Sequence, residues 1–183
     1  NAEHLDTELR FLGLARLWNV VEYWYPYRDM ISMSWTEILR DAIPGFLEAE
    51  DDVAYRLELQ GLLAKLDDGH ASLSKSLFRE APFGECKAPV TVRHLENSWV
   101  VTAIYDAEAE LSLGDIIVAI DSDPIEELVE HWRLFDSASN ETALNYYLGN
   151  TLLTRPCENS SLELTVERNG ESRKFDVALE PLS

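Results

Sequence analysis

The period of the hydrophobic pattern changes once along the chain. Between residues 6 and 66, apolar side chains recur every three or four positions, which is the spacing of amphipathic helices. Beyond residue 72 they alternate in short runs, which is typical of half-buried strands. The pattern therefore predicts an α+β protein with a three-helix up-and-down bundle at 1–72, a linker at 73–84 and a β-rich module at 85–183. This module is expected to be a small, partly open β-barrel that carries two helices.

Polar and proline residues mark both ends of the first helix. Asp6 or Thr7 can cap its start, because a side-chain oxygen there can accept a hydrogen bond from a free amide of the first turn. Pro26 disfavours helical geometry in the residue before it, so the helix is expected to end near Tyr25.

Similar signals divide the rest of the helical half. Ser34–Glu37 fits a capping box, with a serine at the cap and a glutamate three residues on. Pro44, followed by a glycine, is predicted to kink or break this second helix, because proline removes one ladder hydrogen bond and clashes with the previous turn. Asp51 or Asp52 then caps a third helix that runs to about residue 66.

The second half of the chain is predicted to contain strands, two helices and a closing hairpin. An Asn-Gly pair at 169–170 lies between two alternating runs, which is the strongest short-range signal of a β-hairpin. The predicted strands cover Val90–Leu95, Trp99–Ile104, Ile116–Asp121, Leu162–Arg168 and Phe175–Leu179, and the predicted helices run from Pro124 to Phe135 and from Asn140 to about Leu153.

A short polar run, Leu66–Ser72, separates the two halves. Gly69 can adopt a positive φ and so end the third helix or turn the chain sharply. His70 is thereby placed at a corner between a helix and the strand-like segment that begins at Ser72, where its side chain can point into a cleft. The alternative interpretation is a helix cap with a surface histidine that has no function.

The composition limits the possible partners. Hydrophobic residues make up 46% of the 183 residues and charged residues 27%, as in ordinary soluble globular domains. The formal net charge of −19 argues against nucleic acid, because phosphates would be repelled, and it disfavours an anionic membrane surface. No apolar run is long enough to span a membrane.

The first residues of the chain give information on the cellular compartment of the protein. Asn1–His4 lacks the basic start and the apolar core of a signal peptide. Because the chain does not begin with Met, it is expected to be a mature fragment from which an export signal has been removed. The acidic charge is compatible with an exported bacterial protein of the periplasm or cell envelope, and a cytoplasmic location is the alternative.

Cysteine and histidine content gives no support for a metal or cofactor site. Cys86 and Cys157 are too few and too far apart in sequence for a metal framework. A disulfide between them is one possibility in an oxidising compartment, but two unpaired, partly buried thiols are favoured. The histidines show no metal-ligand spacing, so neither a metal nor a cofactor is expected; they are His4, His70, His94 and His131.

Three segments together resemble one family. Leu113–Asp121, which reads Leu-Gly-Asp-Ile-Ile-Val-Ala-Ile-Asp, resembles the strand-turn-strand signature of PDZ domains. Trp18–Tyr27 resembles the N-terminal helical domain of C-terminal processing (tail-specific) and tricorn-core serine peptidases. The Asp68–Ala71 run falls where that family joins its helical domain to its PDZ domain. The order and spacing of these segments are specific, and the similarity covers essentially the whole chain.

The resemblance implies a role for His70. In the tricorn-like branch, the histidine at this junction resembles the general base of a Ser-His-Glu arrangement, whereas processing peptidases often use a Ser-Lys pair instead. The family's nucleophilic serine lies in a third, α/β domain after the PDZ domain, which is expected to follow Ser183. No Gly-x-Ser-x-Gly motif is present in the chain. The chain is therefore expected to be the N-terminal portion of a larger peptidase and to be inactive alone.

The resemblance also implies a peptide groove. PDZ domains bind the C-terminus of a peptide or unfolded protein as an added strand between a sheet edge and a helix. Here the edge strand is expected at Val90–His94, the groove helix at Asn140–Leu153 and the carboxylate loop at Lys87–Val90, where Pro89 removes one amide donor. One alternative to the peptidase is a non-catalytic PDZ-type peptide-binding or scaffold module. A separate alternative is that the groove is vestigial and that the domain only orients its neighbours. The expected peptide-binding residues are Lys87, Val90, Thr91, Val92, Asn140, Leu144 and Tyr147.

Overall fold

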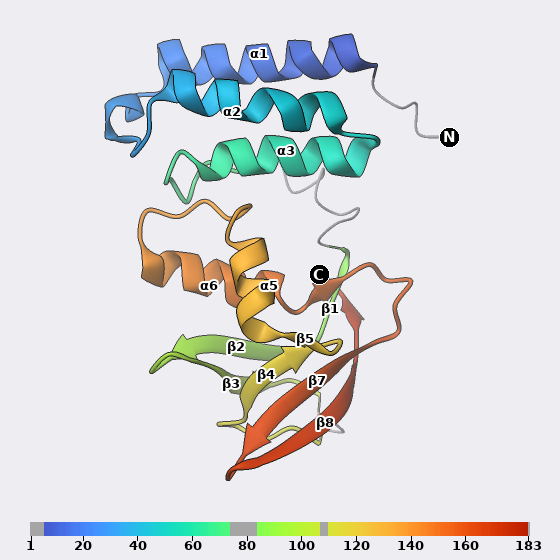
Figure 1. The fold of residues 1–183 in the computed structure, drawn as a ribbon. Coiled ribbons are helices and arrows are strands. Elements are labelled where there is room, and N and C mark those ends of the chain that lie inside the picture. Colours follow the sequence, from blue (N-terminus) through green and yellow to red (C-terminus); the bar gives the residue numbers. More distant parts are fainter. Residues whose placement is uncertain (1–5, 74–83, 107–109, 183) are drawn as a thin grey trace. The chain divides into compact units, whose positions relative to one another are not determined.

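The protein has an α+β fold, which confirms the predicted fold class. The computed structural model describes residues 6–73, 84–106 and 110–182 (Figure 1). Its contacts divide the chain into two compact units. The first, here called the helical unit, comprises Asn1–Leu73 together with Phe135–Ser139. The second, the β-rich unit, comprises Ser74–Leu134 and Asn140–Ser183.

The helical unit is built from three α-helices and one turn of 3₁₀ helix, and no strand is assigned among its described residues. The Asp6 carboxylate caps the first helix by accepting from the Glu8 amide at 2.9 Å, and Asp51 caps the third by accepting from the Ala54 amide at 2.8 Å. Both of these caps were among the predicted ones. The elements are α1 (Thr7–Trp24), η1 (Arg28–Met30), α2 (Trp35–Glu48) and α3 (Asp52–Ala64).

Two predictions about α2 are only partly met. Ser34 occupies the N-cap position, but its side chain makes no capping hydrogen bond. Pro44 does not break the helix, which continues to Glu48 and ends where the amide of the capping residue Ala49 donates to the Gly45 carbonyl at 2.9 Å. Tertiary packing offsets the lost hydrogen bond, because Phe46, just past the proline, is fully buried in the core.

Two tryptophans tie α1 to α2. The Trp18 indole donates to the Trp35 carbonyl at 3.2 Å, and the Trp35 indole donates to the Trp18 carbonyl at 3.0 Å. Trp35 is buried and Trp18 is partly buried, so both indoles contribute apolar contact area while their single polar group stays paired. The rest of this core is aliphatic and aromatic, and its buried members are Leu14, Val21, Trp35, Ile38, Phe46, Leu62, Leu63 and Leu66.

The end of α3 differs from the prediction in its detail. The residue with positive φ is Asp67, at 52°, rather than Gly69. Ser72 and Leu73 are not part of a strand. Most of the linker predicted at 73–84 lies outside the described residues.

The described residues of the β-rich unit form two sheets and two helices. The larger sheet has the strand order β2-β3-β4-β7-β8 with β5 beside β4, and the smaller has the order β6-β1-β9. The strands are β1 (Cys86–Lys87), β2 (Val90–Leu95), β3 (Ser98–Ile104), β4 (Ile116–Ile120), β5 (Asp123–Pro124), β6 (Thr154–Arg155), β7 (Ser161–Arg168), β8 (Glu171–Ala178) and β9 (Glu180–Pro181). The helices are α5 (Ile125–Trp132) and α6 (Glu141–Thr151).

The two longer hairpins of the larger sheet turn through left-handed residues. Asn169 and Gly170 have φ values of 54° and 79° between β7 and β8, and Glu96 and Asn97 have 49° and 64° between β2 and β3. Two successive positive φ values match the right-handed twist of the paired strands. The Asn-Gly prediction is confirmed, and β2 has the predicted bounds.

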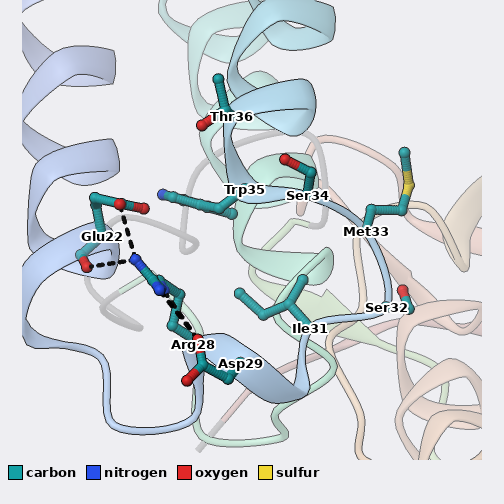
Figure 2. A pocket seen from close by; sticks show the side chains of 9 residues that line it. All are labelled: Glu22, Arg28, Asp29, Ile31, Ser32, Met33, Ser34, Trp35 and Thr36. Carbon is teal, nitrogen blue, oxygen red and sulfur yellow. Dashed lines mark hydrogen bonds and ion pairs between the residues drawn. The ribbon is translucent and has the colours of Figure 1, made fainter.

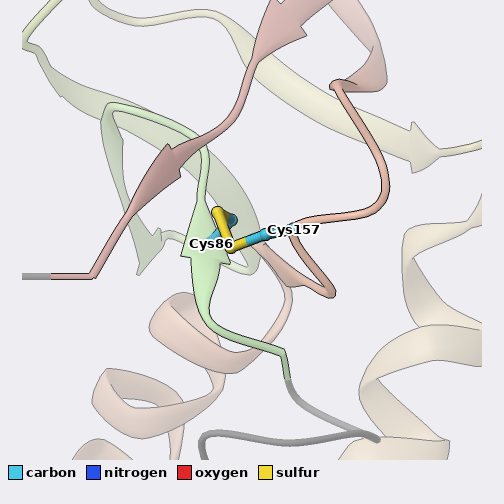
Figure 3. Close-up of a disulfide and its surroundings, with 2 residues drawn as sticks. All are labelled: Cys86 and Cys157. Atoms are coloured by element: carbon cyan, nitrogen blue, oxygen red, sulfur yellow. A yellow bond between two sulfur atoms is a disulfide. The ribbon is translucent and has the colours of Figure 1, made fainter.

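The expectation of two free thiols is wrong. Cys86 and Cys157 form a disulfide (Figure 3). The pairing follows from the smaller sheet, in which Cys86 of β1 lies opposite Arg155 of β6, so that Cys157 is only two residues further along the chain. Cys86 is buried, with 4% of its surface exposed. The bridge therefore connects the first strand of this unit to the segment after α6.

A buried ion pair connects β4 to β7 at one end of the larger sheet. Arg168 donates to Asp115 through Nε at 2.6 Å and through Nη2 at 2.7 Å, and the Ser112 amide donates to the same carboxylate at 2.7 Å. Only 1% of Asp115 is exposed. Burial alone would raise the pKa of Asp115, but these hydrogen bonds and the charge of Arg168 lower it below its ordinary value.

The lowered pKa of Asp115 predicts acid sensitivity of the β-rich unit. At pH values between the pKa of Asp115 in the folded protein and its higher pKa in the unfolded chain, the unfolded chain binds more protons. The stabilisation by Asp115 is therefore present above about pH 4 and is lost as the pH falls through the pKa of the folded protein. Asp115→Asn should lower the Tm at pH 7 by at least about 4 °C, the shift that a loss of about 1 kcal/mol causes in a small domain. It should also flatten the decline of Tm between pH 5 and pH 3, measured by circular dichroism. An unchanged decline would contradict this account.

Candidate functional site

His70 lies in a tight turn just after α3, in which the Ala71 amide donates to the Asp68 carbonyl at 2.8 Å. Its side chain is fully exposed. The ring atom Nδ1 lies 3.1 Å from Asp68 Oδ1, and the same oxygen accepts from the His70 amide at 3.0 Å. The turn therefore holds the Nδ1 side of the imidazole against the Asp68 carboxylate, and the rest of the ring, with Nε2, is exposed to solvent.

Asp68 is itself held by a network within the helical unit. Tyr25 donates its hydroxyl to Asp68 Oδ2 at 2.9 Å, and the Asp68 amide donates to Ser137 Oγ at 3.1 Å. The His70 amide, first of all, lowers the pKa of Asp68, so the carboxylate stays charged. Burial and the hydrogen bond to Asp68 raise the pKa of Tyr25 to about 12, so its hydroxyl stays a donor.

This arrangement suits a general base. A carboxylate at Nδ1 favours the tautomer that carries its proton on Nδ1, and Nε2 can then accept a proton from a reacting hydroxyl. Sequence reasoning identified His70 but missed Asp68 as its partner. The available signal was the Asp-Gly-His spacing, because an aspartate two residues before a histidine can fold back onto its amide and ring.

The groove residues lie in the β-rich unit, along β2 and α6. Within the described residues β2 pairs only with β3, so its other edge is free, and α6 packs along β2 (Figure 1). At one end, Lys87 Nζ donates to Asn150 Oδ1 at 2.8 Å and so connects β1 to the last turn of α6. Burial lowers the pKa of Lys87, and the charge of Arg93 lowers it further.

The predicted peptide-binding residues have different surroundings. The side chains of Val90 and Val92 point into the core, with 1% and 2% exposed, so only their backbone groups could meet a peptide. Asn140 caps α6 by accepting from the Ala143 amide at 2.9 Å, which occupies its side-chain oxygen. The other predicted residues are Lys87 at the start of the groove, Thr91, whose hydroxyl lies 3.1 Å from that of Tyr105, Leu144, which packs against the core, and Tyr147, which is 37% exposed.

Four residues that the sequence did not single out also lie where β2 meets α6. Arg93 reaches from β2 to α6, with its guanidinium 4.6 Å from the centre of the Tyr146 ring. Asn145 Nδ2 lies 3.2 Å from His94 Nδ1. Alternation along β2 and helical spacing along α6 do not reveal such contacts, because they depend on how the helix lies against the strand.

A separate pocket of about 460 Å³ opens in the helical unit where η1 leads into α2 (Figure 2). Arg28 lies in it, paired with Glu22 at 2.8 Å and with Asp29 at 3.0 Å. None of the predicted site residues lines this pocket. Its lining residues are Glu22, Arg28, Asp29, Ile31, Ser32, Met33, Ser34, Trp35 and Thr36.

The part of the chain that the structure describes contains no group of three or more histidine, cysteine or acidic side chains that could hold a metal ion. None of the described helices combines the length and the apolar character that a membrane crossing requires.

Solved structures show the same fold at low sequence identity. The structure of mature CPAF complexed with lactacystin matches with a TM-score of 0.76 and 16% identity, over 97% of this chain and 35% of that chain. A crystal structure of a CPAF mutant matches with a TM-score of 0.71 and 14% identity, over 97% of this chain and 34% of that one. The chain thus spans about a third of the length of these two structures. No curated protein matches its sequence.

The β-rich unit also matches a family model. The model describes a PDZ domain, and it matches residues 85–177, which is just over half of the chain. The matched range contains β2 and α6, on which the groove prediction rests, and all of the closing hairpin except Ala178. The chain therefore belongs to the PDZ domain family.

Proposed function

We propose that the chain is the substrate-recognition portion of a serine peptidase of the tail-specific or tricorn-core type. In this proposal, the PDZ domain binds the C-terminus of a peptide or unfolded protein along β2. His70 supplies the general base of an active site that a catalytic domain of the same polypeptide completes. The chain alone recognises substrate but does not hydrolyse it.

The free edge of β2 beside α6 is the observation that carries the recognition part. PDZ domains bind extended peptides at such an edge, where main-chain hydrogen bonds supply affinity and side-chain pockets supply specificity. Lys87, half-buried at the end of β1 and three residues before β2 begins, adds a positive charge where the peptide carboxylate would lie. The strongly acidic chain otherwise repels an anionic terminus, although salt screens this repulsion beyond about 10 Å.

The Asp68–His70 pair supports the catalytic part. A serine hydroxyl is a weak nucleophile until a neighbouring base takes its proton, and a base held in one tautomer by a carboxylate is suited to that task. Because the serine and the base would lie on different domains, hydrolysis would depend on their assembly. The match of nearly the whole chain to a third of a longer polypeptide supports the same proposal.

A titration tests the recognition part. Isotope-labelled chain is titrated with a short peptide that ends in apolar residues and a free carboxylate, and amide shifts are followed by NMR. We expect a Kd on the order of 10–100 μM or weaker, with the shifts confined to β2 and α6. The same peptide with an amidated C-terminus serves as the control and should bind more weakly. The absence of shifts at millimolar peptide would contradict the recognition role.

Lys87→Met should weaken binding of the free-carboxylate peptide about tenfold, because it removes one charge-assisted hydrogen bond to the terminus. The amidated peptide should bind the variant and the wild type alike. Lys174→Met is the matched control, because Lys174 is an exposed lysine of β8 that is paired with Glu163. Equal affinities of the wild type and Lys87→Met for the free-carboxylate peptide would rule out Lys87 as the carboxylate contact.

The second candidate is a non-catalytic PDZ-type module that binds peptides or orients its neighbours. The full exposure of the His70 side chain favours this second candidate, because a histidine on the surface can be present without any catalytic role. The two candidates differ in what the encoded polypeptide contains. A third domain with an activated serine supports the peptidase, and a polypeptide without one supports the module.

A further inference from the structure

The backbone groups of Val92 face the free edge of β2. Its partner in β3 is Val101. The Val101 amide donates to the Asp115 carbonyl at 2.9 Å, and the Val101 carbonyl accepts from the Gly114 amide at 2.9 Å, so both groups of Val101 point away from β2. In an antiparallel pair the two opposed residues either exchange both bonds or neither. The N–H and C=O of Val92 therefore point outward, where an added strand would pair.

The Arg93 side chain already occupies the place beside Val92 where an added strand would pair. Its Nη1 donates to the Val92 carbonyl at 3.0 Å, and its guanidinium lies over the ring of Tyr146 on α6. One side chain of β2 thus covers the acceptor that a peptide would use and attaches itself to the helix on the other side of the groove. A charged side chain over an edge strand is a known device against unwanted strand pairing.

The helix itself closes the groove at the same level. Gly149 of α6 comes so near to β2 that a Cβ at this position would lie 2.6 Å from the Val92 carbonyl oxygen. Neighbouring strands need about 4.8 Å between them, so no peptide strand fits between β2 and α6 at Val92. The contact between Asn145 and His94 holds the preceding turn of α6, one turn before Gly149, against the same strand.

We propose that the PDZ groove is closed by the protein's own residues, and that Arg93 is the latch that holds α6 against β2. Peptide binding then requires Arg93 to leave the Val92 carbonyl and α6 to move outward. This inference rests on the proposed peptide recognition and adds its regulation. If only a small fraction of molecules is open, the measured Kd is the intrinsic Kd divided by that fraction. Loosening the latch therefore tightens binding.

Peptide affinity in latch variants tests the proposal. Arg93→Gln removes the latch from the strand side, and Tyr146→Ala removes its seat on α6, where Tyr146 is 51% exposed. Each variant of the whole chain should bind the apolar free-carboxylate peptide about tenfold more tightly than the wild type. Arg173→Gln is the matched control: it removes the same charge from an exposed ion pair with Glu171 and should leave the Kd unchanged.

Hydrogen exchange gives a second readout that needs no ligand. The Val92 amide should exchange faster in both latch variants than in the wild type, while amides of β7 should not change. If the wild type and both latch variants bind the peptide equally, with shifts on β2 and α6, the latch is refuted and peptide recognition stands. If no variant binds at millimolar peptide, both the recognition proposal and the latch are overturned.

Discussion

His70→Ala is expected to lower kcat/KM for peptide hydrolysis by the full-length polypeptide about 10²–10⁴-fold, the usual contribution of general acid–base catalysis. The loss follows from the geometry: the carboxylate of Asp68 holds Nδ1, and Nε2 is free to take the proton of the nucleophile. Because the His70 side chain is fully exposed, its removal costs little packing, and the Tm should change by less than about 2 °C.

A second histidine variant serves as the control, because it shows whether the loss of activity is specific to position 70 or follows from removing any exposed histidine. His131 is another exposed histidine, on α5 of the β-rich unit, and His131→Ala should leave both kcat/KM and Tm unchanged. Asp68→Asn should lower kcat with an intact His70, because an amide no longer enforces the tautomer with the proton on Nδ1. Activity of His70→Ala within about threefold of the wild type would exclude this residue as the base, since even a modest base contributes more than that.

Removing the disulfide is expected to have the largest effect on stability. Replacing both Cys86 and Cys157 with serine opens a loop with a sequence separation of 71 residues. In the chain-entropy model, such a loop corresponds to roughly 4 kcal/mol, and measured losses are typically about 2–4 kcal/mol. The free energy of unfolding of the β-rich unit should fall by this amount, measured by urea denaturation of the whole chain.

The thiol-reduced wild type provides the control. Under a strong reductant the wild type should lose about the same free energy of unfolding as the double-serine variant, and the variant should not respond to the reductant. A single Cys86→Ser change should match the double variant, because either change opens the loop. Equal stabilities of the oxidised wild type and the double variant would contradict a structural role for the bridge.

The longer strands and the aspartate helix caps could be predicted because they depend on local chemistry. Alternation over Val90–Leu95 fixed the bounds of β2, and Asn169 followed by Gly170 fixed the last hairpin. Asp6 and Asp51 were predicted as caps from the free amides that every helix start presents. These features are determined by neighbours within a few residues.

Features that depend on tertiary contacts were missed or mispredicted. Pro44 stays inside α2 because the buried face around Phe46 offsets the missing hydrogen bond. The disulfide depends on the pairing of β1 with β6, two strands of two residues each that give no periodic signal. Asp68 and Arg93 became apparent only through the partners that the fold brings to them. The catalytic and peptide-binding assignments were not tested by the fold and stay predictions.

We propose that His70 acts as the base for a serine carried on the same polypeptide. The most direct test is the reaction of the full-length polypeptide with a serine-directed fluorophosphonate probe, followed by peptide mapping, for the wild type and for His70→Ala. We predict one labelled serine beyond Ser183 in the wild type and labelling at least about 100-fold slower in His70→Ala. No labelled serine, or equal labelling rates in the two proteins, would contradict the claim.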